Sequence, residues 1–197
     1  MSEKLKVYCA GPLFNDAERM EMEQIADVIE SDEHEVFLPQ RDGIEYFTLF
    51  PFLKEKMEAM EARLLLHRII FNLDIYKIIG WSDAVVANLN GVVPDPGTCI
   101  EAALAWYTGK RVVYFKNDDR TQFDGLDNAM IRGLGDYTFV NTISKIAAAL
   151  RAAKPQKPSI ALAEGSALAA DLAISHSQNE YLHTVLRHLG LGHLMEK

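Results

Sequence analysis

Short apolar runs alternate with longer amphipathic segments along most of the chain. The runs are bounded by Gly, Pro or Asn and are rich in Val, Tyr and Phe, which is typical of buried β-strands. The first run ends in a Gly-Pro turn and the second stops at Pro39. The pattern predicts five strands, at residues 5–14, 34–40, 82–91, 111–116 and 137–141.

The amphipathic segments repeat their apolar residues every three or four positions, which is the period of a helix. Asn15 or Asp16 caps the first of them, which runs to about Ile29. Further helices are predicted over residues 51–79, in more than one piece, over a segment that closes at Gly109, and over residues 142–153.

Strands that alternate with helices predict a parallel sheet with helices on both faces. We therefore expect an α/β fold, a flavodoxin-like or Rossmann-like three-layer sandwich with five parallel strands in the order 2-1-3-4-5. Ligands of such folds bind beyond the carboxyl ends of the strands, at the switch point between strands 1 and 3. This rule brings residues 8–15, 38–42 and 88–101 to one crevice.

The composition changes near residue 153, where the stretch AKPQKPS resembles a linker. We expect a catalytic domain over residues 1–153 and a helical extension over residues 154–197, rich in Ala and Leu and interrupted at Gly165. His183 and His188 in this extension are five residues apart, which does not place two imidazoles on one helix face. No metal site is expected there.

Composition and charge narrow the class of protein. The 197 residues are 49% hydrophobic and 24% charged, which suits a packed core. The net charge is −8 and no cluster of Lys and Arg occurs, so neither nucleic acid nor an anionic membrane is expected as a partner. Cys9 and Cys99 are predicted to be buried, reduced thiols. No signal peptide and no apolar run near the roughly 18 residues of a membrane span is found, so a cytoplasmic location is expected.

One carboxylate stands near the start of an otherwise apolar helix. Glu101 is followed by Ala, Ala, Leu, Ala and Trp. The spacing Thr98-x-x-Glu101 fits a capping box, in which Glu101 would only satisfy the helix terminus. Because this helix start belongs to the predicted crevice, a chemical role for Glu101 is favoured over a capping role.

A second carboxylate, Asp74, is predicted to share an apolar helix face. Such a group is costly to bury unless it is paired or used, and its helix leads directly into strand 3. A functional role is therefore favoured over that of a structural buried aspartate. The residues at helical spacing on this face are His67, Ile70, Phe71, Asp74 and Ile78.

Four further polar residues are predicted to border the crevice. Each also has a structural interpretation, as a strand aromatic, a surface loop residue, a turn former or a turn aspartate. They are Tyr8, Gln40 and Asn88 at the ends of strands 1, 2 and 3, and Asp95 between two prolines. No GxGxxG, P-loop or GxSxG motif accompanies them, so a neutral polar ligand such as a nucleoside or sugar is expected, without a cofactor.

Four motifs, in this order and spacing, resemble the nucleoside 2-deoxyribosyltransferase family over about residues 4–150. They are VYCAGPLF, NLDIYKIIGWSDAVVANLNG, DPGTCIEAALAWYTGKRVVYF and DNAMIRG. One departure is Ala103, where the family often has Gly. The resemblance implies exchange of the base of 2'-deoxyribonucleosides with free nucleobases, in nucleoside salvage, through a covalent deoxyribosyl-glutamate and with no cofactor or metal.

The resemblance also implies a role for each matching residue. Glu101 becomes the nucleophile and Tyr8 its hydrogen-bonding orienter, while Asp74 and Asp95 contact the leaving base and the sugar hydroxyls. The last two binding residues would reach the active site of a neighbouring subunit, which implies a homo-oligomer. The implied binding residues are Gly11, Phe14, Gln40, Asn88, Gly97, Asn128 and Met130.

Two other functions stay open. The run AMIRG at residues 129–133 also resembles a related 5'-phosphodeoxynucleoside N-hydrolase, but that branch has a phosphate-binding serine where this chain has Asn128. The first loop, AGPLFN, is not the Gly-, Ser- and Arg-rich loop expected for a phosphate. A non-catalytic nucleoside or nucleotide sensor on the same fold is the third possibility, since fold alone does not determine function.

Overall fold

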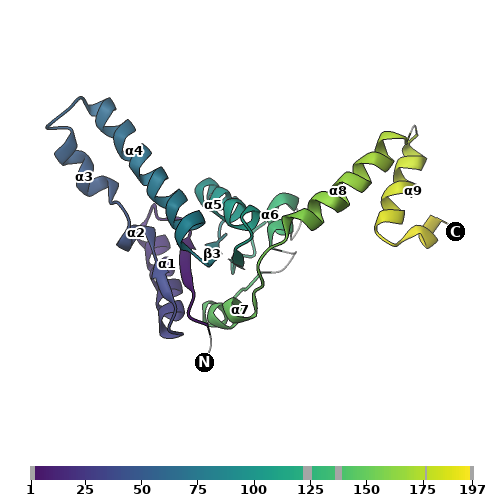
Figure 1. Ribbon diagram of the computed structural model, residues 1–197, viewed down its shortest axis with the longest axis horizontal. Helices are drawn as coiled ribbons and strands as arrows, with labels where there is room; N and C mark the ends of the chain where they lie inside the picture. The colour runs from purple at the N-terminus through teal and green to yellow at the C-terminus, as the bar shows by residue number, and fades with distance from the viewer. Residues whose placement is uncertain (1–2, 122–125, 136–138, 176, 196–197) are drawn as a thin grey trace. The chain divides into compact units, whose positions relative to one another are not determined.

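The computed structural model describes residues 3–121, 126–135, 139–175 and 177–195. Along the chain they divide between Gln156 and Lys157 into two compact units. The first unit contains a β-sheet and its helices, and the second contains helices α8 and α9 (Figure 1). The boundary lies three residues beyond the one predicted from the linker composition.

The sheet of the first unit is parallel. Its strands are β1 (Lys6–Ala10), β2 (Glu35–Phe37), β3 (Ala84–Asn88) and β4 (Arg111–Phe115), in the order β2-β1-β3-β4. Tyr8 pairs with Phe37 on one side and with Val85 on the other. The predicted α/β fold with a parallel sheet and a switch point between strands 1 and 3 is therefore confirmed.

The prediction of five strands is wrong for the part of the chain that the structure describes, which has four. Where the fifth strand was expected, Val140 forms a single parallel bridge with Phe115. The chain then turns at once into the short helix η2 (Ile143–Lys145), which leaves no length for a ladder. The first two residues of the predicted strand, 137 and 138, lie outside the described residues.

Helices cover both faces of the sheet because strand side chains alternate between faces. Val7 and Cys9 face α1 (Asp16–Ser31) and α7 (Ile146–Ala152). Tyr8 and Ala10 face α5 (Pro96–Tyr107) and the π-helix η1 (Tyr76–Trp81). The predicted cap of α1 is confirmed, since the Asn15 side chain accepts a hydrogen bond from the backbone of the first turn.

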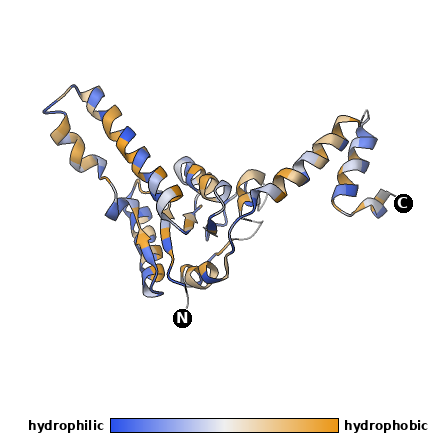
Figure 2. Cartoon of the chain, in the orientation of Figure 1, coloured by the Kyte–Doolittle hydropathy of each residue, from blue (hydrophilic) through white to orange (hydrophobic). Residues whose placement is uncertain are grey.

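The connection between β2 and β3 is long and helical. It comprises α2 (Pro39–Asp42), α3 (Tyr46–Leu53) and α4 (Ala59–Ile75), followed by η1. The predicted helical segment thus begins earlier than residue 51. In α4 the buried residues are Ala62 and Leu66. Phe71 is 62% exposed, so the predicted apolar face through Phe71 is wrong at this position. Figure 2 shows many hydrophobic residues along α3 and α4.

The second unit consists of α8 (Pro158–Ala173), α9 (Gln178–His188) and the short helix η3 (Gly192–Met195). Helix α8 continues through Gly165, so the predicted interruption there is wrong. A single glycine costs about 1 kcal/mol relative to alanine, which the surrounding Ala and Leu residues can offset. Within the described residues, no helix is both long and apolar enough to cross a membrane.

Candidate active site

Helix α5 begins at the carboxyl end of the sheet, and Asp95 is its N-cap. One carboxylate oxygen of Asp95, Oδ2, accepts hydrogen bonds from the Thr98 backbone N–H at 2.7 Å and from the Thr98 hydroxyl at 3.0 Å. Thr98 is therefore not the cap, and the capping-box interpretation of Thr98 and Glu101 is wrong. The carboxylate of Glu101 is free to point elsewhere.

That carboxylate points to the sheet. The Tyr8 hydroxyl donates a hydrogen bond to Oε1 of Glu101 at 2.8 Å, which joins residues 93 positions apart in the sequence. The Tyr8 ring is fully buried and stacks on Phe37 with ring centroids 5.6 Å apart. Strand packing thus holds the hydroxyl in place, and the hydroxyl orients Glu101.

Asp74 lies in the last turn of α4, near Tyr8 and Glu101. Burial raises the pKa of Asp74 to about 6, and a hydrogen bond with Tyr8 opposes part of the rise. The pKa of Tyr8 is raised by burial and by the nearby charges of Glu101 and Asp74. The Tyr8 hydroxyl thus donates a hydrogen bond to Glu101, and Asp74 lies near enough to Tyr8 for the two groups to shift each other's pKa.

Burial raises the pKa of Glu101 to about 8, and the nearby charges of Asp74 and Asp95 add to the rise. The hydrogen bond from Tyr8 acts in the opposite direction. The start of α5 favours an ionised Glu101 by roughly 0.3–1 kcal/mol. A shift from 4.5 to about 8 corresponds to several times that energy, at about 1.4 kcal/mol per pKa unit. Desolvation, rather than the helix dipole, therefore dominates the ionisation of Glu101.

Two predicted binding residues meet at the switch point between β1 and β3. A Cβ on Gly11 would lie 2.2 Å from Sδ of Met22 and 3.2 Å from Cβ of Asn88, so a larger residue there would displace the buried Met22 side chain. The buried Asn88 amide donates to Glu21 of α1 at 2.7 Å. Glu21 also accepts from Asn90 at 3.0 Å, which places a carboxylate at this end of the sheet. The sequence analysis did not single out Glu21.

Gln40 contacts α1. Its amide nitrogen donates to the Arg19 carbonyl at 2.9 Å and to the Glu23 carboxylate at 2.8 Å. The carbonyl and the carboxylate can only accept hydrogen bonds, so the amide nitrogen, and not the oxygen, must face them. Its oxygen, Oε1, is buried and has no hydrogen-bond partner among the described residues.

The other predicted binding residues lie apart from the Tyr8–Glu101 pair or play local roles. Phe14 and Met130 are 82% and 78% exposed. Asn128 caps α6 (Ala129–Leu134) by accepting from the Met130 backbone at 2.9 Å. Gly97 lies in the first turn of α5, where a Cβ would be 3.0 Å from the Asp95 carboxylate. None of the described hydrogen bonds connects Phe14, Asn128 or Met130 with Glu101.

A buried ion pair supports the loops around this end of the sheet, and sequence reasoning missed it. The Lys116 ammonium lies 2.9 Å from Asp127, and both side chains are 5% exposed. It also donates to the carbonyls of Leu89 at 3.2 Å and Gly91 at 2.8 Å. One side chain therefore connects the loop that precedes α5 with the segment that carries Asn128.

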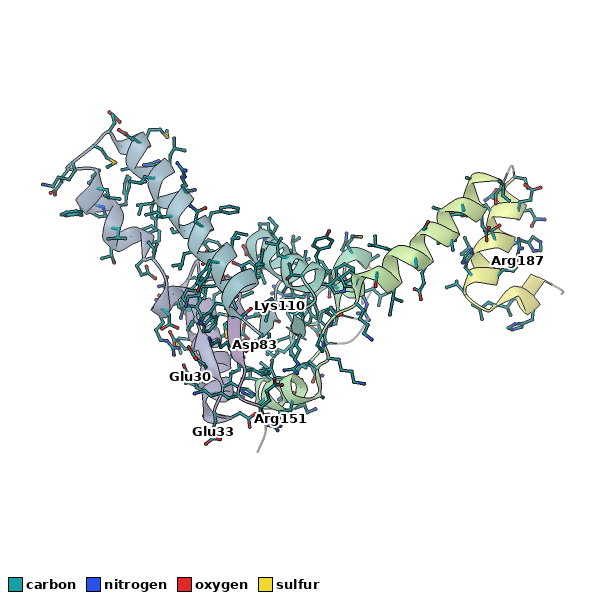
Figure 3. All side chains as sticks on the ribbon, viewed as in Figure 1. Glu30, Glu33, Asp83, Lys110, Arg151 and Arg187 are labelled. Carbon is teal, nitrogen blue, oxygen red and sulfur yellow. The ribbon has the colours of Figure 1, made fainter. Side chains whose placement is uncertain are left out.

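Polar contacts with a structural role lie at the other end of the sheet, where the strands begin. Asp83, labelled in Figure 3, accepts a hydrogen bond from the Lys6 backbone at 2.9 Å. Lys110, also labelled there, donates to the Ser82 carbonyl at 2.6 Å. Asp83 therefore joins the start of β1 to the turn before β3 and has a structural role. Cys9 is buried as predicted, whereas Cys99 is only partly buried.

One known protein family matches the part of the chain that carries these residues. The family model described as nucleoside 2-deoxyribosyltransferase matches residues 7–130, which include Tyr8, Asp74, Asp95 and Glu101. The chain belongs to the nucleoside 2-deoxyribosyltransferase family. No curated protein matches the sequence.

Solved structures share the fold of this family member. A conserved protein from Enterococcus faecalis V583 is 20% identical, with a TM-score of 0.56 over 76% of this chain and 99% of that chain. A 2-deoxyribosyltransferase from Bacillus psychrosaccharolyticus is 22% identical, with a TM-score of 0.51 over 77% of this chain and 99% of that chain. At these identities the likeness establishes a common fold and leaves the substrate to be argued from the site.

Proposed function

We propose that this protein is a nucleoside 2-deoxyribosyltransferase, in which Glu101 carries the deoxyribosyl group between two bases. The observation that carries the proposal is the Tyr8 hydroxyl at 2.8 Å from the Glu101 carboxylate, with Asp74 near the same tyrosine. Simple binding of a nucleoside does not need a carboxylate oriented in this way, whereas covalent catalysis does.

Proton placement prepares the three groups for reaction. A tyrosine hydroxyl has one proton to donate and an oxygen that accepts. When the proton of the pair resides on Asp74, that carboxyl donates to Tyr8 and Tyr8 donates to an ionised Glu101. When the proton resides on Glu101, the chain of hydrogen bonds runs the other way. The order of the two pKa values, about 6 for Asp74 and about 8 for Glu101, makes the second arrangement the more populated one. The first provides a nucleophile and an acid together, so this minor form is the reactive one.

In the first step Oε2 of ionised Glu101 attacks C1' of the deoxyribose. The C1'–N bond breaks, its electrons go to the leaving base, and Asp74 gives that base a proton. The product is a glycosyl ester of Glu101, as in retaining glycosidases. Proton donation by a positioned carboxyl contributes on the order of 10²–10⁴-fold to the rate.

In the second step a nitrogen of the incoming base attacks C1' from the opposite face. The ester C–O bond breaks, Glu101 regains its charge, and the proton lost by the base goes to the Asp74 carboxylate. Two displacements give net retention at C1'. Transfer exceeds hydrolysis when the incoming base keeps water away from the ester.

The remaining predicted residues complete the proposal. Asp95 has Oδ1 available for a sugar hydroxyl, because its contacts with Thr98 are made through Oδ2. Gln40 offers its unpartnered oxygen to an N–H group of the base. The exposed Phe14 suits stacking on a base, and Asn128 with Met130 would serve the active site of a neighbouring copy. Residues 1–156 would be the catalytic domain and residues 157–197 an extension.

The charge near the switch point favours a nucleoside over a nucleotide. Glu21 places a carboxylate beside Asn88 and Asn90. The nearby Lys116 is already paired with Asp127 and two carbonyls. A dianionic 5'-phosphate would meet repulsion there, whereas a neutral 5'-hydroxyl can donate to a carboxylate.

The test separates the three functions left open by the sequence. The full chain is incubated with deoxyinosine and adenine, and separately with deoxyguanosine monophosphate. Formation of deoxyadenosine is expected, with the nucleotide left intact. Hydrolysis of the nucleotide without base exchange would replace the proposal with an N-hydrolase, and loss of neither substrate would favour a sensor. Glu101→Ala is expected to lose exchange and keep the fold.

A further inference from the structure

The Tyr8 ring stacks on Phe37, and the sheet itself gives Phe37 little support. Phe37 is the last residue of β2, an edge strand of three residues. Its buried ring lies against Tyr8 on the sheet and meets the Trp81 ring of η1 edge-on, with centroids 6.2 Å apart. Because β2 ends here, the orientation of the Phe37 ring depends on side-chain contacts more than on further strand pairing.

Lys77 of η1 supplies one of these contacts. Its ammonium lies 4.6 Å from the ring centroid of Phe37 and 4.3 Å from that of Trp81. Both distances are within the roughly 6 Å at which the face of an aromatic ring attracts a cation. Lys77 is only partly exposed, and such an attraction is stronger when the cation is partly desolvated. One cation therefore connects the end of β2 with η1.

Lys77 also lies one helical turn beyond Asp74. Helix α4, which carries Asp74, runs directly into η1. The Ser82 backbone N–H donates to the Lys77 carbonyl at 3.0 Å, and this step of five residues is the hydrogen bond of a π-helix. Short π-helical turns are frequent at functional sites. The side chain of Lys77 thus anchors the turn at which the helix of Asp74 leads into β3.

We propose that Lys77 is a positioning residue for base exchange, acting through the rings and the helical turn that it contacts. Through Phe37 it orients the Tyr8 hydroxyl toward Glu101. Through its own helix it holds the turn that follows Asp74. The inference rests on the proposed function, because the groups that Lys77 positions are those of the proposed reaction.

Two substitutions of Lys77 test this role in the full chain. Lys77→Met keeps an unbranched apolar stem and removes the charge, whereas Lys77→Arg keeps a cation that stacks on aromatic rings. For exchange between deoxyinosine and adenine, Lys77→Met is expected to lower kcat about 2–30-fold with little change in KM. Lys77→Arg is expected to stay within about threefold of the wild-type kcat. Lys56→Met is the matched control, since its ammonium lies 5.8 Å from the Phe52 ring of α3, and should leave kcat unchanged.

A second measurement does not require the reaction. The hydrogen bond from Tyr8 lowers the pKa of Glu101, so displacement of the Tyr8 hydroxyl should raise that pKa. NMR titration of the isotopically labelled Glu101 carboxyl, assigned with Glu101→Gln, is expected to show a higher pKa in Lys77→Met. The pKa in Lys77→Arg should equal that of the wild-type protein. In a Phe37→Leu background, Lys77→Met should add no further shift, because the effect passes through the Phe37 ring.

The outcomes separate this inference from the proposed function. A wild-type kcat together with an unshifted Glu101 titration in Lys77→Met would overturn the role of Lys77. So would equal losses in Lys77→Met and Lys77→Arg, or a full additional shift in the Phe37→Leu background, which would indicate an effect of charge at a distance. A wild-type protein that exchanges no base, with the Glu101 titration still shifted in Lys77→Met, would instead contradict the proposed function and support the role of Lys77 at the Tyr8–Glu101 pair.

Discussion

Removing the charge of the proposed nucleophile should stabilise the protein at alkaline pH. Burial raises the pKa of Glu101 from 4.5 to about 8, so the folded state holds this proton over a range in which the unfolded state releases it. Stability is therefore lost as the pH rises through that window, at about 1.4 kcal/mol per pH unit. Glu101→Gln cannot ionise and its amide oxygen still accepts the hydrogen bond from Tyr8.

The full window corresponds to about 5 kcal/mol at 1.4 kcal/mol per pKa unit. Glu101 is only partly buried, and solvent screening reduces the effect, so we expect about 2–4 kcal/mol. Below the unfolded pKa both forms of the side chain are neutral, and the variant should match the wild-type protein there. The variant thus gains stability relative to wild type as the pH rises, while it loses catalytic activity.

Urea unfolding of both proteins at an acidic and an alkaline pH, at equal ionic strength, measures the difference. The exposed Glu55→Gln on the surface is the matched control and should show no pH-dependent difference from wild type. If Glu101→Gln and wild type differ equally at both values of pH, Glu101 is not desolvated. If Glu101→Gln is less stable than the wild-type protein at alkaline pH, ionisation of Glu101 does not destabilise the folded state.

Four further outcomes follow from the structure. Tyr8→Phe removes the 2.8 Å hydrogen bond, so the pKa of Glu101 should rise further and kcat/KM should fall about 10–100-fold, with the limb near 8 moved to higher pH. The kcat/KM of the wild-type protein should be bell-shaped with limbs near 6 and 8, the raised pKa values of Asp74 and Glu101. Asp74→Asn should lower kcat about 10²–10⁴-fold for natural bases and much less for a good leaving group, and a uniform loss would contradict its role as the acid. Lys116→Met leaves the buried Asp127 unpaired and should destabilise the fold by about 3–5 kcal/mol, most of which Lys116→Met/Asp127→Leu should recover. Thermal unfolding of both lysine variants checks this last expectation, and equal stabilities would show that the pair is not needed.

Local sequence could predict the elements but not every contact between them. The alternation of apolar runs and amphipathic segments predicted the four strands of the observed sheet, besides a fifth that the described residues lack, and a cap at Asn15 or Asp16. Such patterns follow from burial and backbone geometry. The spacing of Thr98 and Glu101 could not separate a cap from a catalytic residue. The contact that decided between them joins Tyr8 and Glu101 across 93 positions.

Desolvation and tertiary pairing explain the remaining failures. The dipole of α5 is visible in the sequence, but the burial that raises the pKa of Glu101 depends on tertiary packing. The sequence contains one sign of the Lys116–Asp127 pair, which is a lysine directly after the apolar run of β4. The sequence contains no sign of the role of Glu21, because an acid in the polar pattern of α1 resembles any solvent-exposed residue.

The most direct test of a covalent deoxyribosyl-glutamate is to trap it. A 2-fluoro-2-deoxy nucleoside slows both steps by destabilising the oxocarbenium-like transition state, so the glycosyl ester should accumulate. Peptide mass mapping of the trapped protein should then place one fluorinated sugar on the peptide that contains Glu101, and Glu101→Gln should carry none. A sugar bound to another residue, or base exchange that proceeds with no labelled peptide, would contradict the account.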